Sequence, residues 1–184
     1  MTPSGEPPCF NLPVGGAVTV FLGLGTNVGD RAANLEQALR RIDAVARVEA
    51  VSSIYETEPV GYREQPDFWN IAARCTTELP AQQLMAELLQ IELAMGRQRT
   101  FKNAPRLIDI DILLYDDVIM SDRDLELPHP RMHERAFVLR PLVEIAPGIE
   151  HPRSGVRYAE LLARVPDARV SLVAPPIRVS HETL

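Results

Sequence analysis

One stretch, PRLIDIDILL at residues 105–114, limits what this chain can fold into more than any other segment. Its branched apolar residues predict a buried strand over 107–115. Because strand side chains alternate, the isoleucines and Leu114 are expected on one face, and Asp109 and Asp111 about 7 Å apart on the other. Since carboxylates are rarely buried without a partner, the second face needs something to bind.

Two carboxylates on one rigid face repel each other unless a cation lies between them or one is protonated. Mg²⁺ is the natural candidate, because it takes one or two protein carboxylates and fills its other positions with water and substrate phosphates. The preceding stretch, RQRTFKNAPR, has no acidic residue although the whole chain is acidic. It supplies four cations that suit phosphate oxygens: Arg97, Arg99, Lys102 and Arg106.

Each half of this pattern also has a plain structural interpretation. Two aspartates can belong to an edge strand with a solvated face, and four basic residues can form a solvated loop. Their adjacency and opposite charge favour phosphoryl chemistry on a polyphosphate over these alternatives.

The remaining apolar patterns predict further strands at 17–24, 48–55 and 68–77 and amphipathic helices at 30–45 and 80–96. The resulting order of strand, helix, two strands, helix and strand predicts the α+β class. It is the order of a ferredoxin-like βαββαβ sandwich, an antiparallel sheet with helices packed on one face.

Composition narrows the classes of partner. With 184 residues, 46% of them hydrophobic, the chain is expected to form one domain at 17–166, flanked by a flexible tail at 1–16 and another at 167–184. The net charge of −6 disfavours nucleic acid and anionic membrane as partners. Two cysteines without a disulfide or metal pattern, and a start unlike a signal peptide, predict a cytoplasmic protein.

Several common site types are excluded by spacing. The glycines of FLGLGTNVGD miss the dinucleotide fingerprint, and no Lys-Ser or Lys-Thr follows them as a P-loop requires. His129 and His133 are separated by Pro130 and belong to no zinc motif. The phosphates are therefore expected at the aspartate strand.

The segment KNAPRLIDIDIL at 102–113 resembles the signature of the 6-hydroxymethyl-7,8-dihydropterin pyrophosphokinase family. GLGTNVGD, SSIYETEPVG, QPDFWN and LPHPRMHERAFVLRPLVEIAP resemble further segments of that family in the same order. The resemblance implies transfer of the β,γ-diphosphate of ATP to the hydroxymethyl group of the pterin, with release of AMP, in folate biosynthesis.

The resemblance also implies residue roles. Asp109 and Asp111 would bind two Mg²⁺ ions and form the catalytic set with Arg97 and Arg106. The ATP site would comprise Glu92, Arg97, Arg99, Lys102, Arg106, Ile112, His129 and Arg135.

For the pterin, a flat ring with donors and acceptors on its edge, aromatic faces and an amide are suitable partners. Phe68 and Asn70 share one face of a predicted strand, and the resemblance pairs Phe68 with Phe137 to sandwich the ring while Asn70 binds its edge. Thr57, Glu58 and Val60 would contribute mainly backbone groups. Without the resemblance, the two phenylalanines would be taken for ordinary core residues.

The expected partners are thus ATP and a pterin, with the chain acting as a monomer or weak homodimer. Two departures from the family pattern stand out: Lys102-Asn103-Ala104 replaces the Arg-Trp-Gly of some members, and Glu58 stands where some have proline. Two alternatives stay open. One is a non-catalytic ferredoxin-like module that binds an anion or RNA, and the other is a diphosphotransferase with a different acceptor.

Overall fold

The computed structural model describes residues 16–97, 104–166 and 170–179. The elements in chain order are β1 (Val18–Thr26), α1 (Arg31–Asp43), β2 (Arg47–Val51), β3 (Ile54–Thr57), β4 (Phe68–Thr77), α2 (Ala81–Ala94), β5 (Asp109–Tyr115), β6 (Met120–Ser121), β7 (Glu126–Leu127), the 3₁₀ turn η1 (Met132–Glu134), α3 (Ala136–Ile145), α4 (Tyr158–Arg164) and β8 (Val170–Ala174). No helix in these ranges is both long and apolar enough to cross a membrane.

The main sheet has the strand order β5-β1-β4-β3-β8, with β2 also paired to β4. Every pairing in it is antiparallel. The predicted α+β class with a ferredoxin-like antiparallel sheet is confirmed. Both predicted helices are present, and Asp30 caps the first by accepting a hydrogen bond from the Ala33 N–H, 3.0 Å from nitrogen to oxygen.

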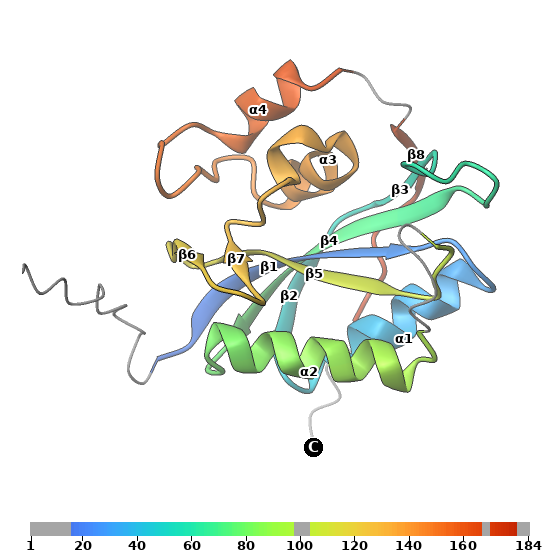
Figure 1. The fold of residues 1–184 in the computed structure, drawn as a ribbon, viewed down its shortest axis with the longest axis horizontal. Helices are drawn as coiled ribbons and strands as arrows, with labels where there is room; N and C mark the ends of the chain where they lie inside the picture. The colour runs from blue at the N-terminus through green and yellow to red at the C-terminus, as the bar shows by residue number, and fades with distance from the viewer. Residues whose placement is uncertain (1–15, 98–103, 167–169, 180–184) are drawn as a thin grey trace, which may run out of the picture.

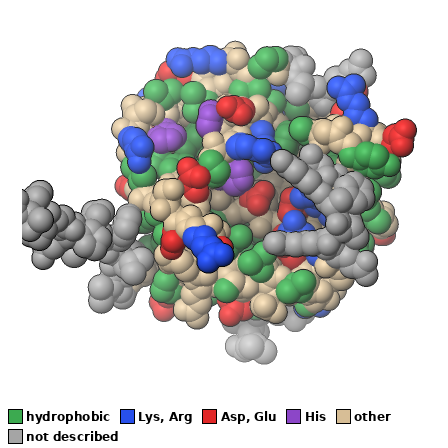
Figure 2. Space-filling view, viewed as in Figure 1, with side chains coloured by type: hydrophobic (Ala, Val, Ile, Leu, Met, Phe, Trp, Pro, Cys, Tyr) green, Lys and Arg blue, Asp and Glu red, His purple; other side chains and the backbone are tan. Residues whose placement is uncertain are grey.

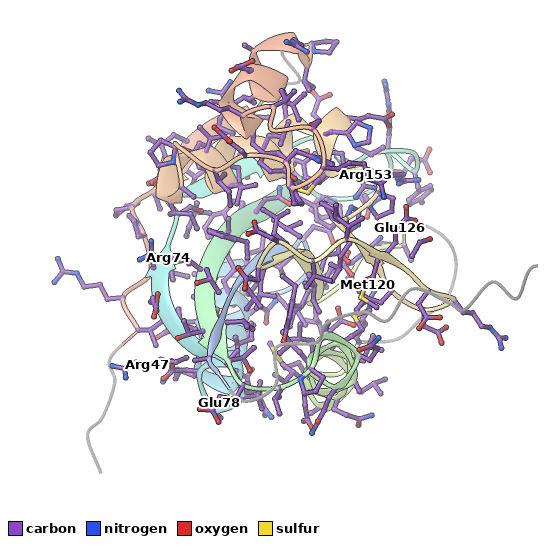
Figure 3. The ribbon with its side chains drawn as sticks, turned by 90° about the vertical axis from the view of Figure 1, so that its left-hand side faces the viewer. Arg47, Arg74, Glu78, Met120, Glu126 and Arg153 are labelled. Carbon is purple, nitrogen blue, oxygen red and sulfur yellow. The ribbon has the colours of Figure 1, made fainter. Side chains whose placement is uncertain are left out.

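Helices cover both faces of the sheet, which corrects the expectation of one covered face. Figure 1 shows α1 and α2 on one side and α3 and α4 on the other. Side chains fill both layers in the view of Figure 3. The sequence pattern concealed α3 because Arg135 and Arg140 interrupt its apolar residues and Pro141 lies inside it. Beside the buried Pro141, three other buried residues nevertheless recur at helical spacing: Ala136, Leu139 and Leu142.

A bulge in β5 changes which core its last residues enter. Leu22 of β1 pairs with Ile112, whereas Phe21 pairs with Leu114, so Leu113 is an extra residue. Ile108, Ile110 and Ile112 enter the core under α1 and α2, as predicted. Leu114, which was expected beside them, packs instead with Phe21 in the core under α3.

The predicted strand at 48–55 is divided into β2 and β3 at Ser52 and Ser53. Both halves pair with the same edge of β4. At the break, the Ser52 N–H donates to the carbonyl of Ala72, and the Ala72 N–H donates to the Ser52 hydroxyl, each at 2.9 Å. The strand therefore bends without losing its connection to β4.

The segment expected to be a C-terminal tail, 167–184, contains β8. This strand pairs with β3 and extends the sheet beyond the expected domain end at residue 166. Its exposed Leu172 and Val173 do not show the alternation that identifies a half-buried strand in a sequence.

Tyr158 offers a stability test. Its side chain is fully buried in the core under α3, and its hydroxyl has no hydrogen-bond partner among the described residues. Because a buried unsatisfied polar group costs about 1–3 kcal/mol, Tyr158→Phe is expected to raise the free energy of unfolding by about 1 kcal/mol. Urea denaturation measures this change. A less stable variant would show that the hydroxyl has a partner after all.

Candidate active site

The register of three strands brings the two predicted halves of the site together. On β1, Gly25 pairs with Asp109 of β5 on one side and with Asn70 of β4 on the other. Gly23 likewise pairs with Asp111 of β5. Directly paired residues point to the same face, and neighbouring strands are about 4.8 Å apart. The aspartates and Asn70 therefore share one face at a separation of two strands, about 10 Å.

The two glycines leave the space between these groups open. A Cβ atom at Gly25 would lie 3.2 Å from Asn70 Oδ1 and 3.8 Å from Phe68 Cδ1. A Cβ atom at Gly23 would lie 3.2 Å from the side chain of Leu113. The glycines thus form a floor without side chains between the amide and the carboxylates.

Gly25→Ala is expected to disturb the Asn70 end of the site. The Asn70 amide must yield by a few tenths of an ångström, whereas Phe68 is at an ordinary contact distance, so we expect the KM of a ligand bound at Asn70 to rise about 10-fold. The KM of a ligand bound at the aspartates should change little. Gly148→Ala is the matched control, because nothing lies within 4 Å of its Cβ position. Equal effects on both ligands in steady-state kinetics would contradict the local origin of the change.

A cavity of about 440 Å³ opens above this floor. Figure 2 shows acidic, basic and histidine side chains gathered around a hollow in this face. The cavity is lined by twelve of the predicted site residues: Thr57, Glu58, Val60, Phe68, Asn70, Arg97, Arg106, Asp109, Asp111, His129, Arg135 and Phe137. Residues from the predicted ATP and pterin sites therefore meet in one space.

Two predicted residues lie away from the cavity, and two others cannot be compared with it. Ile112 is buried in the core under α1 and α2, and its side chain does not line the cavity. Glu92 is 2% exposed and lies behind β5 rather than in the cavity. Arg99 and Lys102 lie outside the described residues.

Asp109 is held by two arginines. Its Oδ1 lies 2.8 Å from Arg97 Nη2, and its Oδ2 pairs with Arg106. Arg97 also pairs with Glu92, whose other oxygen accepts the Ile110 N–H at 2.7 Å. Burial raises the pKa of Glu92, although that N–H and Arg97 act in the opposite direction. Glu92 therefore positions Arg97 and the strand between the two aspartates.

Among the described residues, Asp111 forms no ion pair with an arginine. Its enclosure by protein and the neighbouring Asp109 raise its pKa to about 6, while Arg135 acts in the opposite direction. His129 Nε2 lies 4.0 Å from Asp111 Oδ2. Burial and Arg135 lower the pKa of His129 to about 4, so the imidazole is neutral at pH 7. Asp111 is thus a carboxylate that an added cation would stabilise.

The other end of the cavity carries the amide and the aromatic rings. Asn70 is 7% exposed, and its Nδ2 donates to Thr57 Oγ1 at 2.8 Å, which fixes the amide orientation. The guanidinium of Arg106 lies 5.9 Å from the Phe68 ring centre, and that of Arg135 lies 5.6 Å from the Phe137 ring centre. Each phenylalanine predicted to cover the ring therefore has beside it an arginine predicted to bind phosphate.

Asn27 is a site residue that the sequence did not reveal. It is 2% exposed, and its Oδ1 accepts the Arg106 N–H at 2.9 Å. Its Nδ2 donates to Gln65 Oε1 and to the Pro66 carbonyl, both at 2.9 Å. Asn27 thus joins the segment before Phe68 to the segment before Asp109. The only signal in the sequence was an asparagine after the glycine-rich end of a predicted strand. A tight turn at that point explains such an asparagine equally well.

The donor set at β5 suits Mg²⁺. No group of three or more His, Cys, Asp and Glu side chains able to hold a metal occurs in the described part of the chain. Two carboxylates facing a cavity with arginine walls nevertheless match an ion that completes its shell with water and phosphate oxygens. Asp109 and Asp111 fit such an ion when a polyphosphate accompanies it.

Comparison with known proteins agrees with this arrangement. A family model described as 7,8-dihydro-6-hydroxymethylpterin-pyrophosphokinase (HPPK) matches residues 21–147. The "2-amino-4-hydroxy-6-hydroxymethyldihydropteridine pyrophosphokinase" of Aquifex aeolicus is 40% identical over 134 residues, covering 73% of this chain and 84% of its own length. The protein of the same name from Methylorubrum extorquens is 45% identical over 141 residues, covering 76% of this chain and 89% of its own length.

Longer relatives also match. "Folic acid synthesis protein FOL1" of Dictyostelium discoideum is 39% identical over 158 residues, or 85% of this chain, and the match spans 24% of that protein. The crystal structure of wild-type Plasmodium falciparum HPPK-DHPS superposes with a TM-score of 0.67 at 16% identity, covering 81% of this chain and 45% of that one. At that identity the superposition shows a shared fold.

Proposed function

Because the chain belongs to the 7,8-dihydro-6-hydroxymethylpterin pyrophosphokinase family, we propose that it transfers the β,γ-diphosphate of ATP to the hydroxymethyl oxygen of 6-hydroxymethyl-7,8-dihydropterin. The products are AMP and the pterin diphosphate. The chain is thus an enzyme of folate biosynthesis, and ATP is its co-substrate. This sets aside the non-catalytic alternative.

One observation carries the proposal: Asn70, Gly25 and Asp109 lie side by side on three adjacent strands. A pterin bound at Asn70 would direct its substituent along the glycine floor toward the aspartates. A triphosphate bound at the aspartates would extend toward the same floor. Holding two reactants in this way replaces a bimolecular encounter with a local one, which is a large part of phosphoryl-transfer catalysis.

The acidic and basic residues of the site would have different roles in binding ATP. Asp109 and Asp111 would hold two Mg²⁺ ions, and Arg97, Arg106 and Arg135 would bind phosphate oxygens with their planar guanidinium groups. Bound Mg²⁺ supplies positive charge that offsets the negative charge of the transferred group and of AMP. For Asp109 to take part, Arg97 and Arg106 would exchange some of their carboxylate contacts for phosphate contacts.

At the other end, Phe68 and Phe137 would cover the two faces of the pterin, and Asn70 would bind its edge. Thr57 keeps the Asn70 amide in place through its hydroxyl. Glu58 and Val60, which line the same cavity, would contribute backbone groups. Within this proposal the enzyme works in the cytoplasm as a monomer or weak homodimer, and the free thiol of Cys75 is consistent with a reducing compartment.

The test is to incubate the purified protein with ATP, Mg²⁺ and 6-hydroxymethyl-7,8-dihydropterin and to separate the adenine nucleotides by chromatography. AMP together with a pterin diphosphate is the expected result. ADP would indicate single phosphoryl transfer instead. Retention of ATP would point to the remaining alternative, a diphosphotransferase with another acceptor.

A further inference from the structure

We propose that Glu144 is a positioning residue for the pterin: it ties α3 to β3 and thereby fixes the gap between Phe137 and the face that carries Phe68 and Asn70. The inference rests on the proposed function, because it concerns the binding slot of that reaction. Glu144 itself does not line the cavity.

The contacts of Glu144 are concentrated on one short segment. Its Oε1 and Oε2 accept the Ser53 N–H at 3.0 and 3.1 Å, and Oε1 also accepts the Ser53 hydroxyl at 2.8 Å. Its Oε2 accepts the Tyr55 hydroxyl at 2.8 Å. One carboxylate on α3 therefore receives hydrogen bonds from three donors at the start of β3.

The position of Glu144 is unfavourable for the helix taken alone. It lies in the last turn of α3, where the partial negative charge of the helix C-terminus repels a carboxylate. The strand also gains from the contact, because Ser53 lies at the break between β2 and β3. The contact therefore offsets the unfavourable placement of a carboxylate at the C-terminus of α3. It also gives a hydrogen-bond acceptor to the Ser53 N–H, which lies at the break between the strands.

Of the two elements that Glu144 joins, α3 carries one wall of the slot, and β3 is paired to β4, the strand that carries the opposite wall. Phe137 lies in the first turn of α3 and lines the cavity. On the other side, β3 pairs with β4 so that Tyr55 lies opposite Asn70 and Thr57 lies opposite Phe68. A tilt of α3 away from β3 would widen the gap between the aromatic walls while leaving the aspartates on β5 in place.

The Tyr55 hydroxyl remains a hydrogen-bond donor at neutral and mildly alkaline pH. Burial and the hydrogen bond to Glu144 raise the pKa of Tyr55 to about 12, so its hydroxyl stays protonated and can donate. Glu144 and its partners are accessible to solvent, so the contact acts through geometry more than through a large gain in stability.

The experiment is steady-state kinetics of the full chain with Glu144→Ala. We expect the pterin KM to rise about 5- to 10-fold, with the ATP KM changed less than about 2-fold, the signature of loss at one substrate only. Glu144→Gln should fall between wild type and Glu144→Ala, because its amide oxygen still accepts one or two of the hydrogen bonds. Glu150→Gln, an exposed residue beyond α3 whose carboxylate faces Arg157 at 3.5 Å, is the matched control and should behave as wild type.

Tyr55→Phe keeps the test valid if Glu144→Ala does not fold, since it removes a single hydrogen bond. It should raise the pterin KM about 2-fold in wild type and have a smaller effect in Glu144→Gln, whose amide keeps only part of the contact, if the two residues act through the same contact. An unchanged pterin KM in both Glu144→Ala and Tyr55→Phe, or an equal rise in both KM values, would overturn the inference alone. Absence of AMP formation by the wild-type chain would overturn the proposed function and the inference with it.

Discussion

Replacing Asp111 with asparagine is expected to lower turnover about 1,000-fold, equivalent to about 4 kcal/mol of transition-state stabilisation. The substitution removes one of two carboxylates proposed to hold Mg²⁺ without changing side-chain volume. The fold should persist, because within the described ranges Asp111 pairs with no arginine and lies beside the neutral imidazole of His129, 4.0 Å away. Removing a charge that lies close to Asp109 should leave the free energy of unfolding equal to or higher than that of wild type.

Asp109→Asn should differ from Asp111→Asn in stability while sharing its loss of turnover. Asp109 receives ion pairs from Arg97 and Arg106, and all three side chains are less than one quarter exposed. Because the two arginines pair with different oxygens of Asp109, an amide can accept from only one of them, and its NH₂ group would face the other. We therefore expect a loss of about 1–3 kcal/mol in the free energy of unfolding. The two aspartates, identical in the sequence pattern, are thereby distinguished by their contacts.

Activity assays across a Mg²⁺ titration and urea denaturation without Mg²⁺ measure the two effects separately. Asp117→Asn serves as the control, because Asp117 is exposed in the turn after β5. Retained turnover in either active-site variant at saturating Mg²⁺ would refute the metal assignment. Equal destabilisation of the two variants would refute the claim that Asp109, and not Asp111, anchors the arginines.

The candidate site could be predicted from the sequence where the alternation of side chains along a strand and the pattern of charges indicate the same residues. Phe68–Thr77 forms the strand whose bounds the alternation indicated, and Asp109 and Asp111 share the cavity face as the strand period requires. Such features depend on local geometry alone. The position of Leu114 was predicted wrongly for the same reason, since a bulge moves it to the other face.

Other parts of the site depend on contacts between distant segments. Glu92 and Ile110 are joined by a hydrogen bond across 18 positions, and Asn27 and Arg106 by one across 79 positions. No periodicity encodes such pairs. The glycine floor was missed because Gly23 lay inside the predicted strand at 17–24 and Gly25 in the loop expected after it. Their pairing partners on β4 and β5 give them their role.

Phe137→Ala is expected to weaken pterin binding about 10- to 100-fold, or about 1.4 to 2.8 kcal/mol, from lost ring burial and stacking. ATP binding should change less than about 3-fold, although Arg135 lies 5.6 Å from the Phe137 ring centre. Arg135 would still reach phosphate from its place before α3. Calorimetry with the pterin and with a non-hydrolysable ATP analogue plus Mg²⁺ measures both affinities.

Leu93→Ala is the control for removal of an apolar side chain, since Leu93 is 58% exposed on α2. It should leave both affinities unchanged. Comparable weakening of pterin and nucleotide by Phe137→Ala would mean that the ring supports the first turn of α3 and the placement of Arg135 rather than a stacking face. Glu144 acts on the same helix from its far end without lining the slot. Loss of pterin affinity in Phe137→Ala but not in Glu144→Ala would therefore support direct stacking by Phe137 and count against a role of Glu144 in placing α3.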